Sequence, residues 1–164
     1  MPDNTLYPKT SATPDFPGIE ENIIKFWQQD NTFKKSVRGD SEFNFYDGPP
    51  FISGSPHHGT LLSSIVKDIV PRYQTMKGKR VDRKGGWDTH GLPIELSVEK
   101  ELGITKEDIG QSISIVDYNL KCRETVMRYK DMWDDITMKM GYWVDLEHPY
   151  ITFESEYMES VWYL

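Results

Sequence analysis

The residues best suited to chemistry lie at the end of a stretch rich in Gly, Pro and Ser that runs from Asp47 to Thr60. An aromatic segment precedes this stretch and a long amphipathic segment follows it, so it is predicted to join a strand to the first turn of a helix. The first N–H groups of a helix have no partner within the helix, and together with the helix dipole they attract anions, phosphate above all. The sequence therefore predicts an anion-binding turn, although an ordinary strand-to-helix loop has a similar composition.

Four consecutive residues, His57, His58, Gly59 and Thr60, close this turn. Neighbouring histidines on a helix point about 100° apart, which makes them poor metal chelators, and we assign no metal site to this chain. Histidines at a helix N-terminus are better suited to stabilising a phosphoryl transition state, and Gly59 lets a ligand approach the backbone closely. For His58, a surface or packing role fits the sequence equally well.

A second loop with several glycines, residues 85–93, carries Trp87, Asp88 and His90. A partly shielded carboxylate at Asp88 would pair with the ammonium group of a ligand. Asp88 is also able to cap the N-terminus of the next helix, since Asp is a common capping residue. His90 either binds phosphate or braces the loop through its second ring nitrogen, and the sequence alone does not separate these two roles.

Hydrophobic spacing predicts the elements that position these two loops. Alternating residues at 43–46 indicate a half-buried strand, and apolar pairs every four positions from 61 to 78 indicate a helix. Residues 79–84 occupy the place of a parallel partner strand, which would complete a β-α-β unit. Because ligands bind outside the carboxyl ends of parallel strands, we expect both loops to face one crevice.

Further helices are predicted on either side of this unit. They are a short amphipathic helix at 18–30, a helix with Pro93 in its first turn that ends at Gly103, one long helix over 116–141, and a last helix that starts at 152–154. Cys122 opens the apolar seam of the long helix, which favours a core thiol over a nucleophile. Residues 1–16 hold few large apolar side chains and are expected to be extended or disordered.

Composition limits the class of protein. The length of 164 residues fits one domain or a piece of a longer protein, and the last helix lacks a stop signal, which favours a piece. A formal charge of −7 argues against this segment providing the main binding surface for a nucleic acid. A single cysteine suits a reducing compartment, and neither a membrane span nor a secretory signal is present. We therefore expect a cytoplasmic protein with no membrane partner.

The two loops together resemble a known family. Residues 56–60, Pro-His-His-Gly-Thr, are similar to the His-x-Gly-His signature of class I aminoacyl-tRNA synthetases. Residues 86–95 resemble the Gly-Trp-Asp-x-His-Gly-Leu-Pro-x-Glu segment of isoleucyl-tRNA synthetases, from which the valyl and leucyl relatives differ. Residues 46–51 resemble the lead-in of that family and 68–73 its first long helix. The resemblance covers at least residues 16–164.

The resemblance implies an α/β fold: an N-terminal arm with a docking helix at residues 1–40, then the first half of a Rossmann-like parallel-sheet catalytic domain at 41–164, which stops before the editing insertion. It implies an isoleucine–tRNA ligase. In such an enzyme the carboxylate of isoleucine attacks the α-phosphate of ATP, which is bound with Mg²⁺, and the acyl group then passes to tRNA(Ile). Positioning and charge stabilisation supply most of that catalysis. Contacts with tRNA are expected mostly outside this chain.

The same resemblance assigns the site residues. They are His57, His58, Gly59 and Thr60 at ATP, with His57 and Thr60 catalytic; Gly48, Pro49 and Asp88 at the amino acid; and Trp87 and His90 in support. Thr60 stands where the family has a final histidine, and a threonine donates a hydrogen bond but carries no charge. We expect a subgroup that uses threonine with a compensating lysine, rather than an impaired enzyme.

Other family features are missing from this sequence. The Lys-Met-Ser-Lys-Ser signature, the editing domain and the anticodon-binding region do not occur in it. We therefore expect that residues 1–164 by themselves do not aminoacylate tRNA. Two alternatives stand beside the isoleucyl assignment: a valyl or leucyl type of class I synthetase, and a non-catalytic nucleotide-binding remnant of one.

Overall fold

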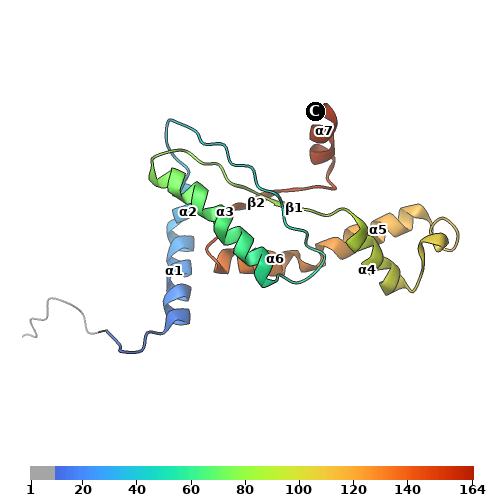
Figure 1. Ribbon diagram of the computed structural model, residues 1–164, viewed down its shortest axis with the longest axis horizontal. Helices are drawn as coiled ribbons and strands as arrows, with labels where there is room; N and C mark the ends of the chain where they lie inside the picture. Colours follow the sequence, from blue (N-terminus) through green and yellow to red (C-terminus); the bar gives the residue numbers. More distant parts are fainter. Residues whose placement is uncertain (1–9) are drawn as a thin grey trace, which may run out of the picture.

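The computed structural model describes residues 10–164, so the expectation for the first residues of the arm lies outside the described part. Figure 1 shows an elongated arrangement, with α1 and α2 at one end, α4 and α5 at the other, and two strands between them. The elements are α1 (Phe16–Asp30), α2 (Thr32–Ser36), α3 (His58–Met76), β1 (Lys84–Trp87), α4 (Leu92–Leu102), η1 (Lys106–Asp108), α5 (Ile115–Val126), η2 (Met127–Tyr129), α6 (Lys130–Lys139), β2 (Asp145–Ile151) and α7 (Ser155–Tyr163).

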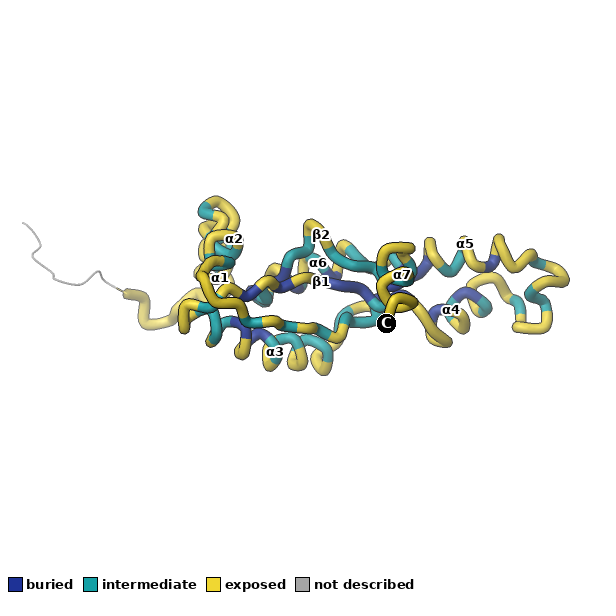
Figure 2. The backbone as a smooth tube through the Cα atoms, turned by 90° about the horizontal axis from the view of Figure 1, so that it is seen from above, coloured by how far each residue is buried: buried dark blue, intermediate teal, exposed yellow. Residues whose placement is uncertain are grey.

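The centre of the fold is a parallel pair of strands, as the α/β prediction requires. β1 and β2 pair with Lys84 opposite Asp145, Gly86 opposite Tyr150 and Trp87 opposite Ile151. α3 and α6 both border a small cavity that β1 also lines, so both helices lie beside the strands. A tube drawing coloured by burial shows the buried residues concentrated along β1 (Figure 2).

The predicted strand at 79–84 is displaced in the structure. β1 begins at Lys84 and includes Gly85, Gly86 and Trp87, which were predicted to form a loop. The glycines lie in the strand because β2 packs closely against them. A Cβ on Gly85 would lie 2.7 Å from the carbonyl oxygen of Asp145, and one on Gly86 would overlap the ring of Tyr150. The second loop therefore starts at Asp88.

The predicted strand at 43–46 is also irregular, although its alternation is real. Phe43 and Phe45 are half-buried, whereas Asn44 and Tyr46 are exposed. The segment runs parallel to the chain around β1 and touches it only at isolated bridges, Glu42 with Arg80 and Phe51 with Asp88. It forms no continuous ladder, and the consecutive prolines 49 and 50 provide no N–H groups for one.

Helix α3 follows the prediction in extent but not in which face it buries. It runs from His58 to Met76 with Pro71 inside it, and Gly78 follows at a positive φ of 82°. The apolar stripe is exposed in this chain, and its exposed members are Leu62, Ile65, Val66, Ile69, Val70 and Tyr73. The buried residues of the helix are Asp68 and Pro71, which belong to its opposite side. Hydrophobic periodicity therefore identified the helix but not its packing face.

The predicted single helix over 116–141 is wrong, because the chain forms α5 and α6 with a 3₁₀ turn, η2, between them. The break separates two packing partners: α5 contacts α4, and α6 contacts α1. Trp133 of α6 and Trp87 of β1 meet edge to face with ring centroids 6.4 Å apart in the main core. Cys122 packs against that core as predicted, and burial raises the pKa of its thiol.

Within residues 10–164, no helix combines the length and the apolar character needed to cross a lipid bilayer. The division of the chain at residue 40 stays a prediction.

Candidate functional site

The turn at 57–60 forms the N-terminus of α3. His57 has extended backbone angles (φ −128°, ψ 160°), and its carbonyl oxygen accepts hydrogen bonds from the N–H groups of Thr60 and Leu61 at 3.0 and 3.1 Å. Among the residues that the structure describes, no side chain caps this end of the helix. His57, His58 and Gly59 are exposed, so the positive end of the helix dipole faces solvent. This geometry suits an anion.

The His57 ring of this turn is in contact with Thr60 and lies close to Gly59. The hydroxyl of Thr60 lies 3.1 Å from Nε2 of His57. The imidazole ring lies so close to Gly59 that a Cβ there would be 3.2 Å from its Cε1 and Nδ1 atoms. The ring is therefore held between a glycine and a hydroxyl, with one nitrogen engaged and its orientation defined.

The second group of predicted residues meets at one cavity. Pro49, Asp88 and His90 line a cavity of about 380 Å³ together with residues of β2's end and α7, namely Thr152, Tyr157, Met158, Val161 and Trp162. The two loops are joined at its edge, because the N–H of Asp88 donates to the carbonyl of Pro50 at 3.0 Å. A cavity of this size falls in the range of small-molecule sites, roughly 300 to 1,000 Å³.

Asp88 is not a helix cap. The N-cap of α4 is Gly91, and no side chain bonds to that helix end. The Asp88 carboxylate instead accepts the N–H of His90 at 3.2 Å, which holds the loop in a local turn. The alternative role as a cap of α4 is therefore wrong, and the carboxylate is half-buried at the cavity.

Other predicted residues lie behind or beside the cavity. Trp87 is only 2% exposed and packs on Trp133, whose indole N–H donates to the carbonyl of Gly54 at 2.8 Å. Trp87 thus supports the loop from the core and does not line the cavity. Gly48 is also absent from the lining, as are the four residues 57–60. The structure brings Pro49, Asp88 and His90 together and leaves the helix N-terminus as a separate feature.

Several residues at the site were not singled out from the sequence. Asp47 is one, because its carboxylate is 8% exposed and bonded to Lys67 and to Tyr142. Tyr150 is another: its hydroxyl donates to the carbonyl of Asp47 at 3.0 Å, and burial, followed by the charge of Asp47, raises its pKa to about 12. The only sequence signal for Asp47 was its place at the start of the glycine-rich stretch.

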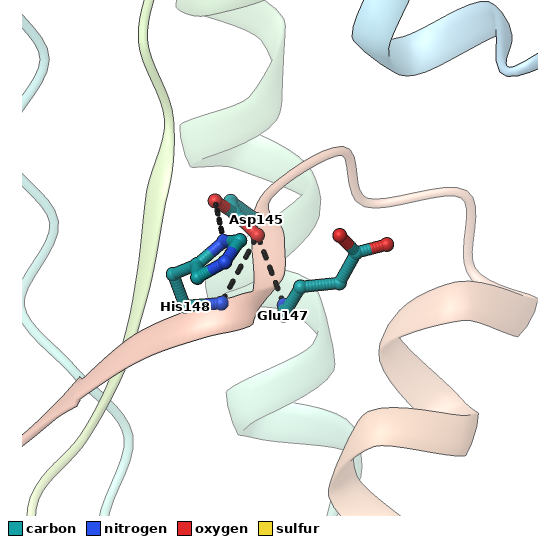
Figure 3. A group of neighbouring side chains, drawn as sticks. All are labelled: Asp145, Glu147 and His148. Carbon is teal, nitrogen blue, oxygen red and sulfur yellow. Dashed lines mark hydrogen bonds and ion pairs between the residues drawn. The ribbon is translucent and has the colours of Figure 1, made fainter.

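One group of metal-ligating side chains lies together in the described residues, away from both loops in the sequence. Asp145, Glu147 and His148 place ligand atoms within 4.8 Å of one another, at the start of β2 (Figure 3). Their contacts account for the arrangement. Asp145 accepts the N–H groups of Glu147 and His148 and faces the His148 ring at 3.2 Å, while Glu147 pairs with Lys34 at 2.7 Å. We assign these side chains a structural role at the start of β2.

Comparisons with known proteins agree on one family. The family model described as tRNA synthetases class I (I, L, M and V) matches residues 22–164. The isoleucine–tRNA ligase of Cytophaga hutchinsonii is 58% identical over 149 residues, which cover 89% of this chain and 13% of that protein. The isoleucine–tRNA ligase of Porphyromonas gingivalis is 52% identical over 153 residues, covering 92% of this chain and 14% of that protein.

A solved structure supports the fold. The crystal structure of a LeuRS–tRNA–LeuAMS ternary complex from Agrobacterium radiobacter K84 superposes with a TM-score of 0.58 at 21% identity, covering 84% of this chain and 16% of that one. At that identity the likeness concerns the fold alone. The chain thus spans about one seventh of the length of the relatives that it matches, 13% and 14% of the two ligases named above.

Proposed function

Because this chain belongs to the class I tRNA synthetases of the I, L, M and V group, we propose that it works as part of an isoleucine–tRNA ligase. The protein would catalyse the reaction of isoleucine with ATP, which forms bound isoleucyl-adenylate and releases pyrophosphate. It would then transfer the isoleucyl group to tRNA(Ile). The relatives at 58% and 52% identity are isoleucine–tRNA ligases, which supports this substrate over valine or leucine. We further propose that it acts in the cytoplasm.

The observation that carries the proposal is the cavity shared by Pro49, Asp88 and His90. A small amino acid needs an anionic partner for its ammonium group and an apolar surface for its side chain. The Asp88 carboxylate would provide the first, and Pro49 with the apolar residues of α7 the second. Gly48, the residue before Pro49, would contribute backbone next to the ligand, since it carries no side chain to obstruct one.

The N-terminus of α3 is proposed to receive ATP, which arrives as its Mg²⁺ complex. The helix dipole would bind the phosphates together with the side chains of His57 and His58 and the backbone of Gly59. His57 and Thr60 would donate hydrogen bonds as negative charge builds up on the α-phosphate. The isoleucine carboxylate oxygen bonds to the α-phosphorus while the bond to the leaving pyrophosphate breaks. The protein then contributes position and charge and forms no covalent bond itself.

Amino-acid-dependent pyrophosphate exchange tests the proposal in the full-length protein. We expect exchange with isoleucine, and a much lower kcat/KM with valine or leucine. A preference for leucine or valine would assign the chain to another member of the group. Absence of exchange with all three, together with ATP binding, would favour a non-catalytic nucleotide-binding remnant.

Asp88→Asn isolates the charge at the cavity. Asparagine keeps an oxygen that accepts the N–H of His90, so the loop retains its local turn. Loss of the negative charge is expected to raise the KM for isoleucine roughly ten- to a hundredfold, since a charged hydrogen bond contributes about 1.5 to 3 kcal/mol. The KM for ATP should stay within about twofold. An unchanged KM for isoleucine would remove Asp88 from the amino-acid site.

A further inference from the structure

Asp47 connects the stretch that carries Gly48 and Pro49 to two other parts of the fold. One carboxylate oxygen accepts a hydrogen bond from Nζ of Lys67, in α3, at 2.5 Å. The other accepts a hydrogen bond from the hydroxyl of Tyr142, just before β2, at 2.8 Å. Its backbone carbonyl accepts the hydroxyl of Tyr150 of β2 at 3.0 Å. The carboxylate is almost fully buried, and both of its oxygens have charged or hydroxyl partners.

These contacts determine where Pro49 can lie. On its N-terminal side the chain is held at Asp47, and on its C-terminal side the carbonyl of Pro50 accepts the N–H of Asp88 at 3.0 Å. Only Gly48 and Pro49 separate the two anchors, and a proline has a fixed φ near −65°. The two anchors therefore restrict the positions that Pro49 can take.

Tyr150 connects Asp47 to another residue that lines the same cavity. Its ring lies over Gly86, where a Cβ would overlap it. The ring also stacks on Tyr157 of α7, with centroids 5.6 Å apart and the planes 8° from parallel. Tyr157 and Pro49 both line the cavity, so Tyr150 contacts one lining residue through its ring face and, through its hydroxyl, the residue two positions before the other.

We propose that Asp47 and Tyr150 are positioning residues that set the distance between Pro49 and Tyr157, and thereby the width of the amino-acid cavity. This inference rests on the proposed function, because the cavity must hold the amino acid. Neither residue contacts the substrate. Their contribution is to keep the cavity at one width before the substrate enters, so that little binding energy is used to order it.

Tyr150→Phe in the full-length protein tests the proposal. The substitution keeps the ring on Gly86 and the stack on Tyr157 and removes only the hydrogen bond to Asp47. We expect the KM for isoleucine in pyrophosphate exchange to rise about tenfold, while the KM for ATP and the thermal unfolding midpoint stay nearly unchanged. A general loss of structure would instead change both KM values and the midpoint together.

Tyr118→Phe is a matched control. Tyr118 is a buried tyrosine whose hydroxyl, like that of the half-buried Tyr150, donates to a backbone carbonyl, that of Glu95 at 3.4 Å, and it lies outside the Asp47 network. It should leave the KM for isoleucine unchanged. Equal effects of the two variants, or a parallel rise in both KM values for Tyr150→Phe, would overturn the positioning role.

A second variant, Asp47→Asn, weakens the anchor from the other side by removing the charge that faces Lys67. It is expected to raise the KM for isoleucine in the same selective way, and a selective rise in the KM for ATP would contradict the proposal. These experiments distinguish the proposed function from the positioning role. A wild-type protein without isoleucine-dependent exchange would overturn the proposed function, whereas an active wild type with an unaffected Tyr150→Phe variant would overturn only the positioning role.

Discussion

The hydroxyl of Thr60 lies 3.1 Å from Nε2 of His57, across the first turn of α3. Thr60 occupies the position at which the class I signature has its final histidine. In this chain its side chain holds the remaining histidine in place, and Lys67 lies two turns further along the same helix, bonded to Asp47. Because Lys67 is paired with Asp47, we propose that Thr60 contributes hydrogen bonding to this turn and that Lys67 is not the compensating lysine.

Thr60→Val tests that contribution. Valine keeps the branched side chain but has no hydroxyl, so the His57 ring loses its partner. We expect kcat for isoleucine-dependent pyrophosphate exchange to fall about tenfold, the size expected for one hydrogen bond of about 1.4 kcal/mol. Thr60→Ser keeps the hydroxyl and should retain most of the activity.

Thr60→His restores the residue of the family signature. If threonine substitutes for that histidine in function, the exchange rate is expected to stay equal or to rise. A loss of tenfold or more would contradict this view and would show that the turn around His57 has become specific for threonine.

Gly59→Ala is predicted to separate activity from stability. The new Cβ would lie 3.2 Å from the His57 ring and displace it, so kcat for exchange should fall about tenfold. Alanine is the better helix former, so the thermal midpoint should not fall. Gly54→Ala is the control, because a Cβ there meets no atom within 4 Å. Equal activities of the two variants would show that the orientation of the ring does not matter.

Asp68 and Arg83 form a buried ion pair, and removing the charge of either residue is expected to change stability by a different amount. The Arg83 side chain is 1% exposed, lies 3.5 Å from Asp68 and donates to Thr75 at 2.8 Å. Burial lowers the pKa of Arg83, and the charge of Asp68 opposes that shift. Asp68→Asn leaves the buried cation without its counter-charge and is expected to destabilise the protein by about 3 kcal/mol in urea unfolding.

Arg83→Met should cost less, because Asp68 keeps its second partner, Arg72, one turn along α3. Lys139→Met is the control for removing a charge, since its pair with Asp135 is exposed and should contribute under about 1 kcal/mol. If Asp68→Asn is as mild as Lys139→Met, the pair makes no net contribution to stability.

Stability at alkaline pH should depend on Tyr150. Burial, and then the charge of Asp47, raises the pKa of its hydroxyl in the folded protein to about 12, against about 10 in the unfolded chain. The folded state thus binds this proton more tightly, so the stabilisation is complete below pH 10 and is lost as the pH rises towards 12. Thermal midpoints from pH 8 to 12 should fall more steeply for the wild type than for Tyr150→Phe, because lysines titrate equally in both. Parallel curves would contradict the raised pKa.

Local sequence patterns determined much of the fold. Periodicity placed the helix after residue 57, and Pro93 and Gly103 marked the two ends of α4. These features depend on residues within one or two turns of each other, which is why a single sequence carries them. The same local motifs also carried the resemblance that the comparisons confirmed.

Only the tertiary structure decided how those pieces pack. Gly85 and Gly86 lie in β1 because Asp145 and Tyr150 approach them from β2, some 60 residues away in the sequence. The contact of Asp47 with Tyr150 joins residues 103 positions apart. Such contacts depend on the whole chain having folded, and no periodicity encodes them. The sequence alone therefore predicted which residues could do chemistry, and long-range packing decided that Pro49, Asp88 and Tyr157 line one cavity.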